Sequence, residues 1–165
     1  MPRSIVPNLW FDTEAEEAAA FYTSVFENSR ILSVARYTEA GPRPAGTVMT
    51  VEFELDGRRF VGINGGTQFK FSEAVSFMVE CETQEEIDYF WERLADGGEE
   101  GPCGWLKDRY GLSWQIVPPV LGELLEDPDP ARAARVMKAM LAMGKLDIAR
   151  LTAAAEASPE VRPGD

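Results

Sequence analysis

Residues 74–98 read AVSFMVECETQEEIDYFWERLADGG, and this stretch decides the fold. Its first seven residues form a strand-like run, and Thr83 followed by Glu86 has the spacing of a capping box, which marks a helix start. Ile87 and Trp91 then recur at helical spacing, and two glycines close the stretch. The stretch therefore predicts a strand followed directly by an amphipathic helix.

The same order occurs once before, nearer the N-terminus. Residues 5–11 form a strand-like run, and residues 12–26 have helical periodicity, with Thr13 and Glu16 as a predicted capping box. A constant shift along the chain places Ala18 of this helix on Ile87 of the later one, and the other apolar positions follow. The repeat indicates a duplicated module.

Further strands complete each module. Asp56-Gly57 is a hairpin signal, and alternation predicts strands at residues 30–38, 48–55, 59–64, 105–107 and 112–117. The fold class is therefore α+β, with two β-α-β-β-β modules at about 1–67 and 74–120 in one domain, residues 1–120.

The chain changes character after two consecutive prolines at 118 and 119. Asp129 and Pro130 are typical of a helix start, and Asp147 begins a second, shorter helix. Residues 121–157 are therefore predicted to be an appendage of two C-terminal helices. Residues 158–165 carry prolines, a glycine and charges, and we expect a flexible tail there.

Charge and composition exclude several classes of partner. The 165 residues include 28 acidic and 16 basic side chains, for a net charge of −12. A chain this acidic repels phosphate backbones and anionic lipid, so we expect no nucleic acid and no membrane among its partners. The N-terminal residues lack the apolar region of a signal peptide, and the expected location is cytoplasmic.

The chain contains no histidine, which excludes histidine triads, histidine bases and histidine metal ligands. Cys81 and Cys103 are predicted to be free thiols, because their spacing matches no redox or zinc motif. The acidic runs at residues 14–17, 80–86 and 99–100 are assigned to solvated faces and helix N-termini, with no chemistry.

Several local motifs resemble one known family. They are Trp10-Phe11-Asp12, Asn64-Gly65-Gly66, Ser113-Trp114-Gln115 and, most specifically, Cys103-Gly104-Trp105-Leu106-Lys107-Asp108. These motifs resemble the PhnB-like branch of the vicinal-oxygen-chelate (glyoxalase, bleomycin-resistance and dioxygenase) superfamily. That branch often carries the label 3-demethylubiquinone-9 3-methyltransferase. The resemblance covers residues 4–155 and implies curved glyoxalase-like sheets around a cup that holds the site.

Metal-using members of the superfamily place His, Glu or Gln ligands on the first and last strand of each module. Carried onto this chain, those positions fall near Pro7, Val61, Ser76 and Gln115. Only Gln115 is a plausible ligand, whereas a divalent ion needs three or four converging donors. We therefore expect no metal and no cofactor. A divalent ion held by Gln115 and Asn64 stays an alternative.

The methyltransferase label is tested by the glycines at residues 62–66. A nucleotide-type glycine loop leads from a strand into a helix, but this one leads towards Thr67-Gln68-Phe69. Methyl transfer is therefore the weaker alternative.

Small-molecule sites are concave and mostly apolar, with a few placed polar groups. The predicted ligand-binding residues are the cup aromatics and two amides, although each aromatic has the alternative of being core: Trp10, Phe69, Phe71 and Trp114, with Asn64 and Gln115. Trp105 is spaced two residues from both Cys103 and Lys107, so it shares their face of the strand. It is expected to face a different side from Trp114.

Cys103 and Asp108 are the candidate catalytic residues. Lys107 and Arg109 follow Cys103 closely, and a nearby cation activates a thiol. The alternative is that Cys103 is a small loop residue beside glycines.

The leading hypothesis is a metal-independent binding protein for a small molecule, which forms a homodimer. Met137, Met140 and Met143 recur on one helix face that either packs internally or covers a partner copy. The alternative is an enzyme acting on a small substrate, through an acquired metal or through Cys103 and Asp108.

Overall fold

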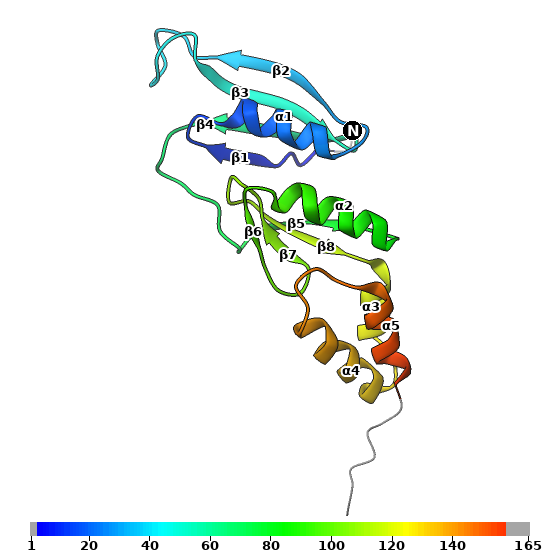
Figure 1. The fold of residues 1–165 in the computed structure, drawn as a ribbon. Helices are drawn as coiled ribbons and strands as arrows, with labels where there is room; N and C mark the ends of the chain where they lie inside the picture. Colours follow the sequence, from blue (N-terminus) through cyan, green and yellow to red (C-terminus); the bar gives the residue numbers. More distant parts are fainter. Residues whose placement is uncertain (1–2, 158–165) are drawn as a thin grey trace, which may run out of the picture. The chain divides into compact units, whose positions relative to one another are not determined.

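The computed structural model of the protein describes residues 3–157. The predicted tail, 158–165, lies outside the described residues. The chain divides into two compact units, residues 1–71 and 72–165. Each unit carries one four-stranded sheet (Figure 1).

The first unit is a β-α-β-β-β module whose sheet has the strand order β1-β4-β3-β2. Strand β1 runs parallel to β4, and the other pairs are antiparallel. Helix α1 lies across one face of this sheet (Figure 1). The elements are β1 (Asn8–Phe11), α1 (Ala15–Val25), β2 (Arg30–Arg36), β3 (Val48–Leu55) and β4 (Arg58–Asn64).

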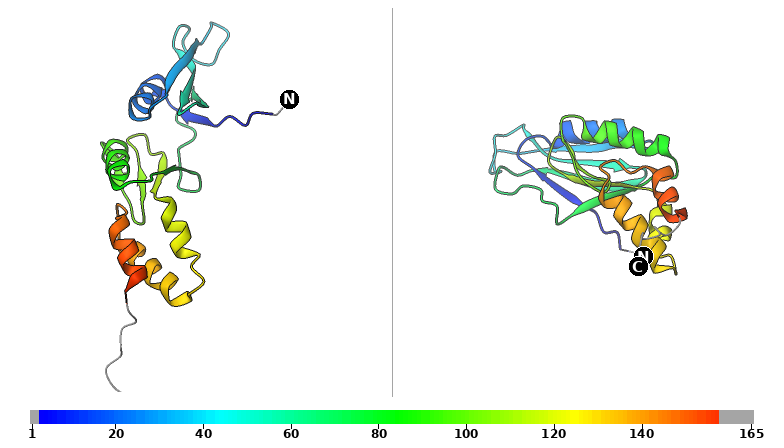
Figure 2. Two further views of the ribbon diagram at one scale, coloured as in Figure 1. Left: turned by 90° about the vertical axis from the view of Figure 1, so that its right-hand side faces the viewer. Right: turned by 60° about the horizontal axis from the view of Figure 1, so that its bottom comes forward.

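The second unit repeats the pattern, with the strand order β5-β8-β7-β6 and a parallel pairing of β5 with β8. Figure 2 shows α2 on one side of this sheet. The predicted pair of β-α-β-β-β modules is thereby confirmed. The elements are β5 (Ser76–Glu80), α2 (Gln84–Ala95), β6 (Glu99–Glu100), β7 (Trp105–Lys107) and β8 (Ser113–Val117).

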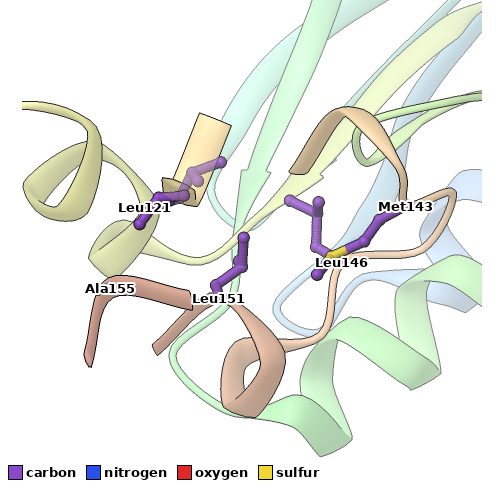
Figure 3. Close-up of a cluster of buried hydrophobic side chains, with 6 residues drawn as sticks. Leu121, Met143, Leu146, Leu151 and Ala155 are labelled. Atoms are coloured by element: carbon purple, nitrogen blue, oxygen red, sulfur yellow. The ribbon is translucent and has the colours of Figure 1, made fainter. Parts of the chain in front are cut away.

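Three helices follow the second sheet: α3 (Pro119–Leu125), α4 (Pro130–Leu141) and α5 (Ile148–Glu156). Helix α3 adds to the two that the sequence predicts, because proline at the first helical position is compatible with helix formation. The buried side chains of the three helices and their connections form one cluster (Figure 3): Leu121, Val136, Met143, Leu146, Leu151 and Ala155. Met143 therefore packs internally, whereas Met137 is exposed.

The second sheet has one covered face and one open face. Leu106, Trp114 and Ile116 are buried, and they alternate with the less buried Trp105 and Gln115. Since successive side chains of a strand point to opposite faces, the buried row lies on the covered face. Trp105 therefore faces away from Trp114, as the sequence predicts.

The two module helices begin differently. The predicted capping box of Thr83 and Glu86 is confirmed at the start of α2. The corresponding prediction for Thr13 is wrong, because α1 begins at Ala15 without a cap from its own segment. Asn64 at the end of β4 supplies the acceptor instead, since its Oδ1 accepts a hydrogen bond from the Ala15 amide at 2.8 Å. A tertiary contact thus replaces the local cap.

Two matched substitutions test this difference. We expect Thr83→Ala to lower the free energy of unfolding by about 1 kcal/mol, because it removes a true cap. Thr13→Ala should change it by less than about 0.5 kcal/mol, the usual range for a surface position without such a role. Urea unfolding followed by circular dichroism measures both. Equal losses in the two variants would contradict the assignment.

Candidate functional site

The second unit contains a cavity of about 470 Å³. Strands β6, β7 and β8 supply most of its wall, together with the loop at 101–104 and the turn before β5. Its lining combines an apolar surface with four charged side chains: Glu73, Glu99, Glu100, Gly101, Pro102, Cys103, Trp105, Leu106, Lys107 and Ser113. This combination is typical of a small-molecule site.

The strand register brings the polar side chains of the cavity together. Lys107 in β7 lies directly opposite Ser113 in β8 and opposite Glu99 in β6. Directly opposed residues in a sheet share a face. Ser76 in β5 is the next neighbour of Ser113 on the same face. The open face of the sheet therefore carries a continuous polar row into the cavity.

An ion pair stands at the centre of this row. The Lys107 ammonium lies 2.5 Å from a carboxylate oxygen of Glu73, which precedes β5. The hydrogen bond and the charge of Lys107 lower the pKa of Glu73, and Glu73 in turn raises the pKa of Lys107. Glu99 adds a smaller attraction that also raises the pKa of Lys107. The pair is therefore charged throughout the neutral range of pH.

Ser113 carries a buried hydroxyl that is not satisfied. The residue is 1% exposed, and its Oγ has no hydrogen-bond partner among the described residues. Buried polar groups are nearly always paired, and leaving one unpaired costs about 1–3 kcal/mol. A ligand or a water molecule in the cavity would supply the missing partner.

The loop at 101–104 is held by the C-terminal part of the chain. The amides of Cys103 and Gly104 donate to the carbonyl oxygens of Met143 and Gly144, each at 2.8 Å. Both loop residues have positive φ, 58° and 82°. A Cβ at Gly104 would stand 2.8 Å from a backbone oxygen and 3.0 Å from Leu146. This side of the cavity is thus shaped by residues of two distant segments.

The structure brings two of the predicted ligand-binding residues, Trp10 and Phe69, into contact in the first unit. The Trp10 ring meets Phe69 edge to face at 4.9 Å, and its Nε1 donates to the Gly66 carbonyl at 2.9 Å. Phe71 instead contacts Phe11, the next residue of β1, whose side chain points to the opposite face of the sheet from Trp10. Phe69 is 64% exposed, so one side of this aromatic group is open to solvent.

Asn64, which the sequence predicts to be a polar ligand contact, is 4% exposed, and its side-chain amide already forms hydrogen bonds within the protein. Besides capping α1, its Nδ2 donates to the carbonyl oxygens of Thr13 and Val48, both at 3.2 Å. These three bonds join β4 to the start of α1 and to β3. The structure gives Asn64 an architectural role.

Trp114 and Gln115 lie on opposite faces of β8. Trp114 is on the covered face, and its Nε1 donates to the Asp108 carboxylate at 2.9 Å. Gln115 is on the open face, where its Nε2 donates to Ser76 Oγ at 2.8 Å. Neither residue lines the cavity.

Asp108 organises the turn between β7 and β8. Its carboxylate accepts hydrogen bonds from the amides of Tyr110 and Leu112 as well as from Trp114. The residue is 2% exposed. These bonds occupy the carboxylate that the sequence proposed as an acid or base.

Cys103 lines the cavity, but its predicted activating cations are engaged elsewhere. Lys107 pairs with Glu73, and Arg109 pairs with Asp96 at 2.8 Å. Both cysteines are free thiols, as predicted. Cys81 is buried, and desolvation, with a smaller contribution from the charge of Glu86, raises its pKa to about 12.

The four positions that correspond to metal ligands in relatives are hydrogen-bonded in two pairs, Pro7 with Val61 and Ser76 with Gln115. Pro7 accepts a hydrogen bond from the Val61 amide, and Ser76 accepts one from Gln115. Their donor atoms do not suit a divalent ion, because proline and valine offer no side-chain ligand. Within residues 3–157, no three His, Cys, Asp or Glu side chains converge.

The glycines at 62–66 do not fit a nucleotide-binding loop. A Cβ on Gly65 would lie within 2.1 Å of the Trp10 ring, so this glycine makes room for the indole. Gly66 has a φ of 112°, and residues 65–75 contain no helix. The segment therefore lacks the helix N-terminus that such a loop uses for phosphate.

Of the ten cavity residues, only Cys103 was selected from the sequence as a candidate site residue; the nine others include Glu73, Glu99, Trp105, Lys107 and Ser113. Alternation within residues 105–107 indicates that Trp105 and Lys107 share a face, and the sequence carries that signal. No sequence pattern indicates that Glu73 and Glu99 belong to the cavity, because strand pairing alone brings them beside it.

Comparison with known proteins identifies relatives. The family described as 3-demethylubiquinone-9 3-methyltransferase matches residues 3–117. A PhnB protein of Bacillus cereus with the same description is 41% identical, over 70% of this chain and 99% of its own, with a TM-score of 0.63. No curated protein matches the chain.

More distant structures share the fold. A Pseudomonas aeruginosa protein, PA1353, is 17% identical over 71% of this chain and 98% of its own, with a TM-score of 0.60. The fosfomycin resistance protein FosX of Listeria monocytogenes, in complex with Mn(II) and sulfate, is 18% identical over 76% of this chain and 99% of its own, with a TM-score of 0.53. No helix within residues 3–157 has the length and apolar character to cross a membrane.

The two thiols should differ in reactivity. We expect iodoacetamide at pH 8 to label Cys103 in the native protein at the rate of an ordinary free thiol, because Lys107 and Arg109 are paired elsewhere. Cys81 should react only after unfolding, since it is buried and protonated. Mass spectrometry of Cys103→Ser and Cys81→Ser variants assigns each label. Labelling of Cys103 more than about tenfold faster than glutathione would indicate an activated nucleophile instead.

Proposed function

Since this chain belongs to the 3-demethylubiquinone-9 3-methyltransferase family, the PhnB-like branch of the vicinal-oxygen-chelate superfamily, we propose that it binds a small molecule without a resident metal. The proposed site is the cavity of the second unit. The observation that carries the proposal is the unpaired, buried hydroxyl of Ser113 beside an apolar wall. Such a hydroxyl is the kind of placed polar group that orients a ligand.

Binding is favoured over catalysis by the state of the candidate catalytic groups. The Asp108 carboxylate is occupied by the turn that it organises, and Cys103 lacks an available cation. A general acid or base must be free to reach the substrate atom to which it gives, or from which it takes, a proton. Methyl transfer has the least support, because Gly65 makes room for the Trp10 ring and no helix begins within residues 65–75.

The aromatic pair Trp10 and Phe69 is proposed as a further ligand contact in the first unit. The exposure of Phe69 and the edge-to-face geometry support this proposal. Phe71, which makes an edge-to-face contact with Phe11, also stays a proposed ligand contact of the first unit. Asn64, Trp114 and Gln115 are proposed to support the two sheets behind these surfaces.

We also infer a homodimer and a cytoplasmic location. Leu141 of α4 is 62% exposed, and Met137 lies one turn before it. Large exposed apolar side chains at helical spacing are typical of an interface. The net charge of −12 and the two free thiols fit a reducing compartment and argue against nucleic acid as a partner.

A fluorescent probe tests the cavity. We expect 1-aminoanthracene, a small neutral aromatic amine, to bind the protein with increased fluorescence, and Trp105→Ala to weaken its affinity about tenfold, or ~1.4 kcal/mol. The reason is that Trp105 supplies an aromatic wall. The control is Tyr89→Ala on α2, which removes a partly exposed aromatic side chain that does not line the cavity.

The same titration tests metal independence. Affinity should be unchanged in excess EDTA, and the melting temperature of metal-stripped protein should not rise with Mn²⁺, Ni²⁺, Zn²⁺ or Mg²⁺. A filled metal site would raise it by several degrees. Absence of probe binding would contradict the proposed site, and a clear rise with one ion would favour a metal-assisted enzyme.

Sedimentation velocity tests the homodimer. We expect a dimer at micromolar concentration, and Leu141→Glu should shift it to a monomer, because a charge would then be buried in the interface. The control is Lys138→Glu, a charge change on an exposed position of the same helix. A wild-type protein that sediments as a monomer would contradict the inference.

A further inference from the structure

The charges that line the cavity of the second unit are unbalanced. Two carboxylates, from Glu73 and Glu99, stand beside a single ammonium, from Lys107, on the open face of the sheet. Glu100 also belongs to the lining, but it lies opposite Leu106 on the covered face, where its carboxylate accepts a hydrogen bond from the Trp91 indole at 2.9 Å. The cavity is therefore net negative within a chain that is itself strongly acidic. Such a field concentrates cations and repels anions.

The contacts of Lys107 strengthen this asymmetry. Its ammonium is already bound by Glu73 and lies across the strands from Glu99. An anionic ligand would have to draw Lys107 away from both carboxylates. A cationic ligand meets no such obstacle, because Glu99 forms no salt bridge within residues 3–157 and Glu73 can exchange one ammonium for another.

The uncharged walls of the cavity indicate the chemical character of the rest of the ligand. Trp105 and Pro102 supply apolar surface along the cavity, and an indole face also attracts a cation within about 6 Å of its ring. The Ser113 hydroxyl can donate or accept one hydrogen bond. Together, these groups suit a molecule with an apolar body and a positively charged end.

We propose that the cavity selects small organic cations with an aromatic or apolar body, such as an arylalkyl amine, and that Glu73 and Glu99 recognise the ammonium. This inference rests on the proposed function and specifies the ligand class for the same site. Lys107 then acts as an internal counter-ion, which occupies the ammonium position until a ligand replaces it.

Three matched probes test the charge preference. We use 2-phenylethylamine, 2-phenylethanol and phenylacetate, which share a phenyl ring and carry a positive, a neutral and a negative end at pH 7. Each is titrated as a competitor of 1-aminoanthracene. The amine should bind about tenfold more tightly than the alcohol, the effect of one charge-assisted hydrogen bond. Phenylacetate should bind most weakly, and raised salt should reduce the difference.

Two substitutions in the ion pair should shift this preference in opposite directions. Glu73→Gln removes a carboxylate and releases Lys107, so amine affinity should fall about tenfold while phenylacetate improves. Lys107→Gln removes the internal competitor, so amine affinity should rise. The control for Glu73→Gln is Glu92→Gln on α2, which makes the same change in net charge at an exposed position outside the cavity. The melting temperature of each variant reports its folding.

The outcomes separate this inference from the proposed function. If 1-aminoanthracene binds but the amine shows no advantage over the alcohol, or if phenylacetate binds best, the cation preference is overturned and the binding function stands. If 1-aminoanthracene itself does not bind, the proposed function fails. An amine preference that both ion-pair variants shift in opposite directions, and that Glu92→Gln leaves unchanged, supports the inference.

Discussion

The parallel pairing of β5 with β8 is the interaction on which the second unit depends. It sets the first strand of the module beside its last, so that Ser76 neighbours Ser113. Strands β7 and β6 then extend the sheet and bring Lys107 to the same row. Glu73 reaches that row because it precedes β5 by a short turn. A shift of one residue in this register would turn every one of these side chains to the other face.

The two modules share this parallel pairing of first and last strands but differ in the side chains on the open face of the sheet. In the first unit, β1 pairs with β4 in parallel, and Val61 and Ile63 occupy the row opposite the buried side chains. In the second unit, the equivalent strand presents Ser113 and Gln115 there. An apolar row suits packing or an aromatic ligand surface, whereas a polar row can orient a ligand. The duplicated architecture has therefore been retained while its open faces have diverged.

The C-terminal helices contribute to the cavity although the family match ends at residue 117. Their cluster holds Met143 and Leu146 (Figure 3), and the backbone at 143–144 accepts the amides of the loop at 103–104. Cys103 and Gly104 both have positive φ, and this backbone conformation is costly in free energy for Cys103, which is not a glycine. These hydrogen bonds offset that cost. The appendage thus supports the loop that forms one wall of the site.

The amino-acid sequence by itself determined the duplicated β-α-β-β-β order, the turn at Asp56-Gly57 and the cap of α2, because periodicity, turn chemistry and capping are local properties. It also identified the family, through the motif at residues 103–108. Only the tertiary structure decided that Asn64 caps α1 in place of Thr13 and that Asp108 belongs to a turn. It alone assembled the cavity from Glu73, Lys107 and Ser113. Glu73 lies far along the chain from Lys107 and Ser113, and strand register, which single-sequence patterns do not specify across such a distance, makes them neighbours.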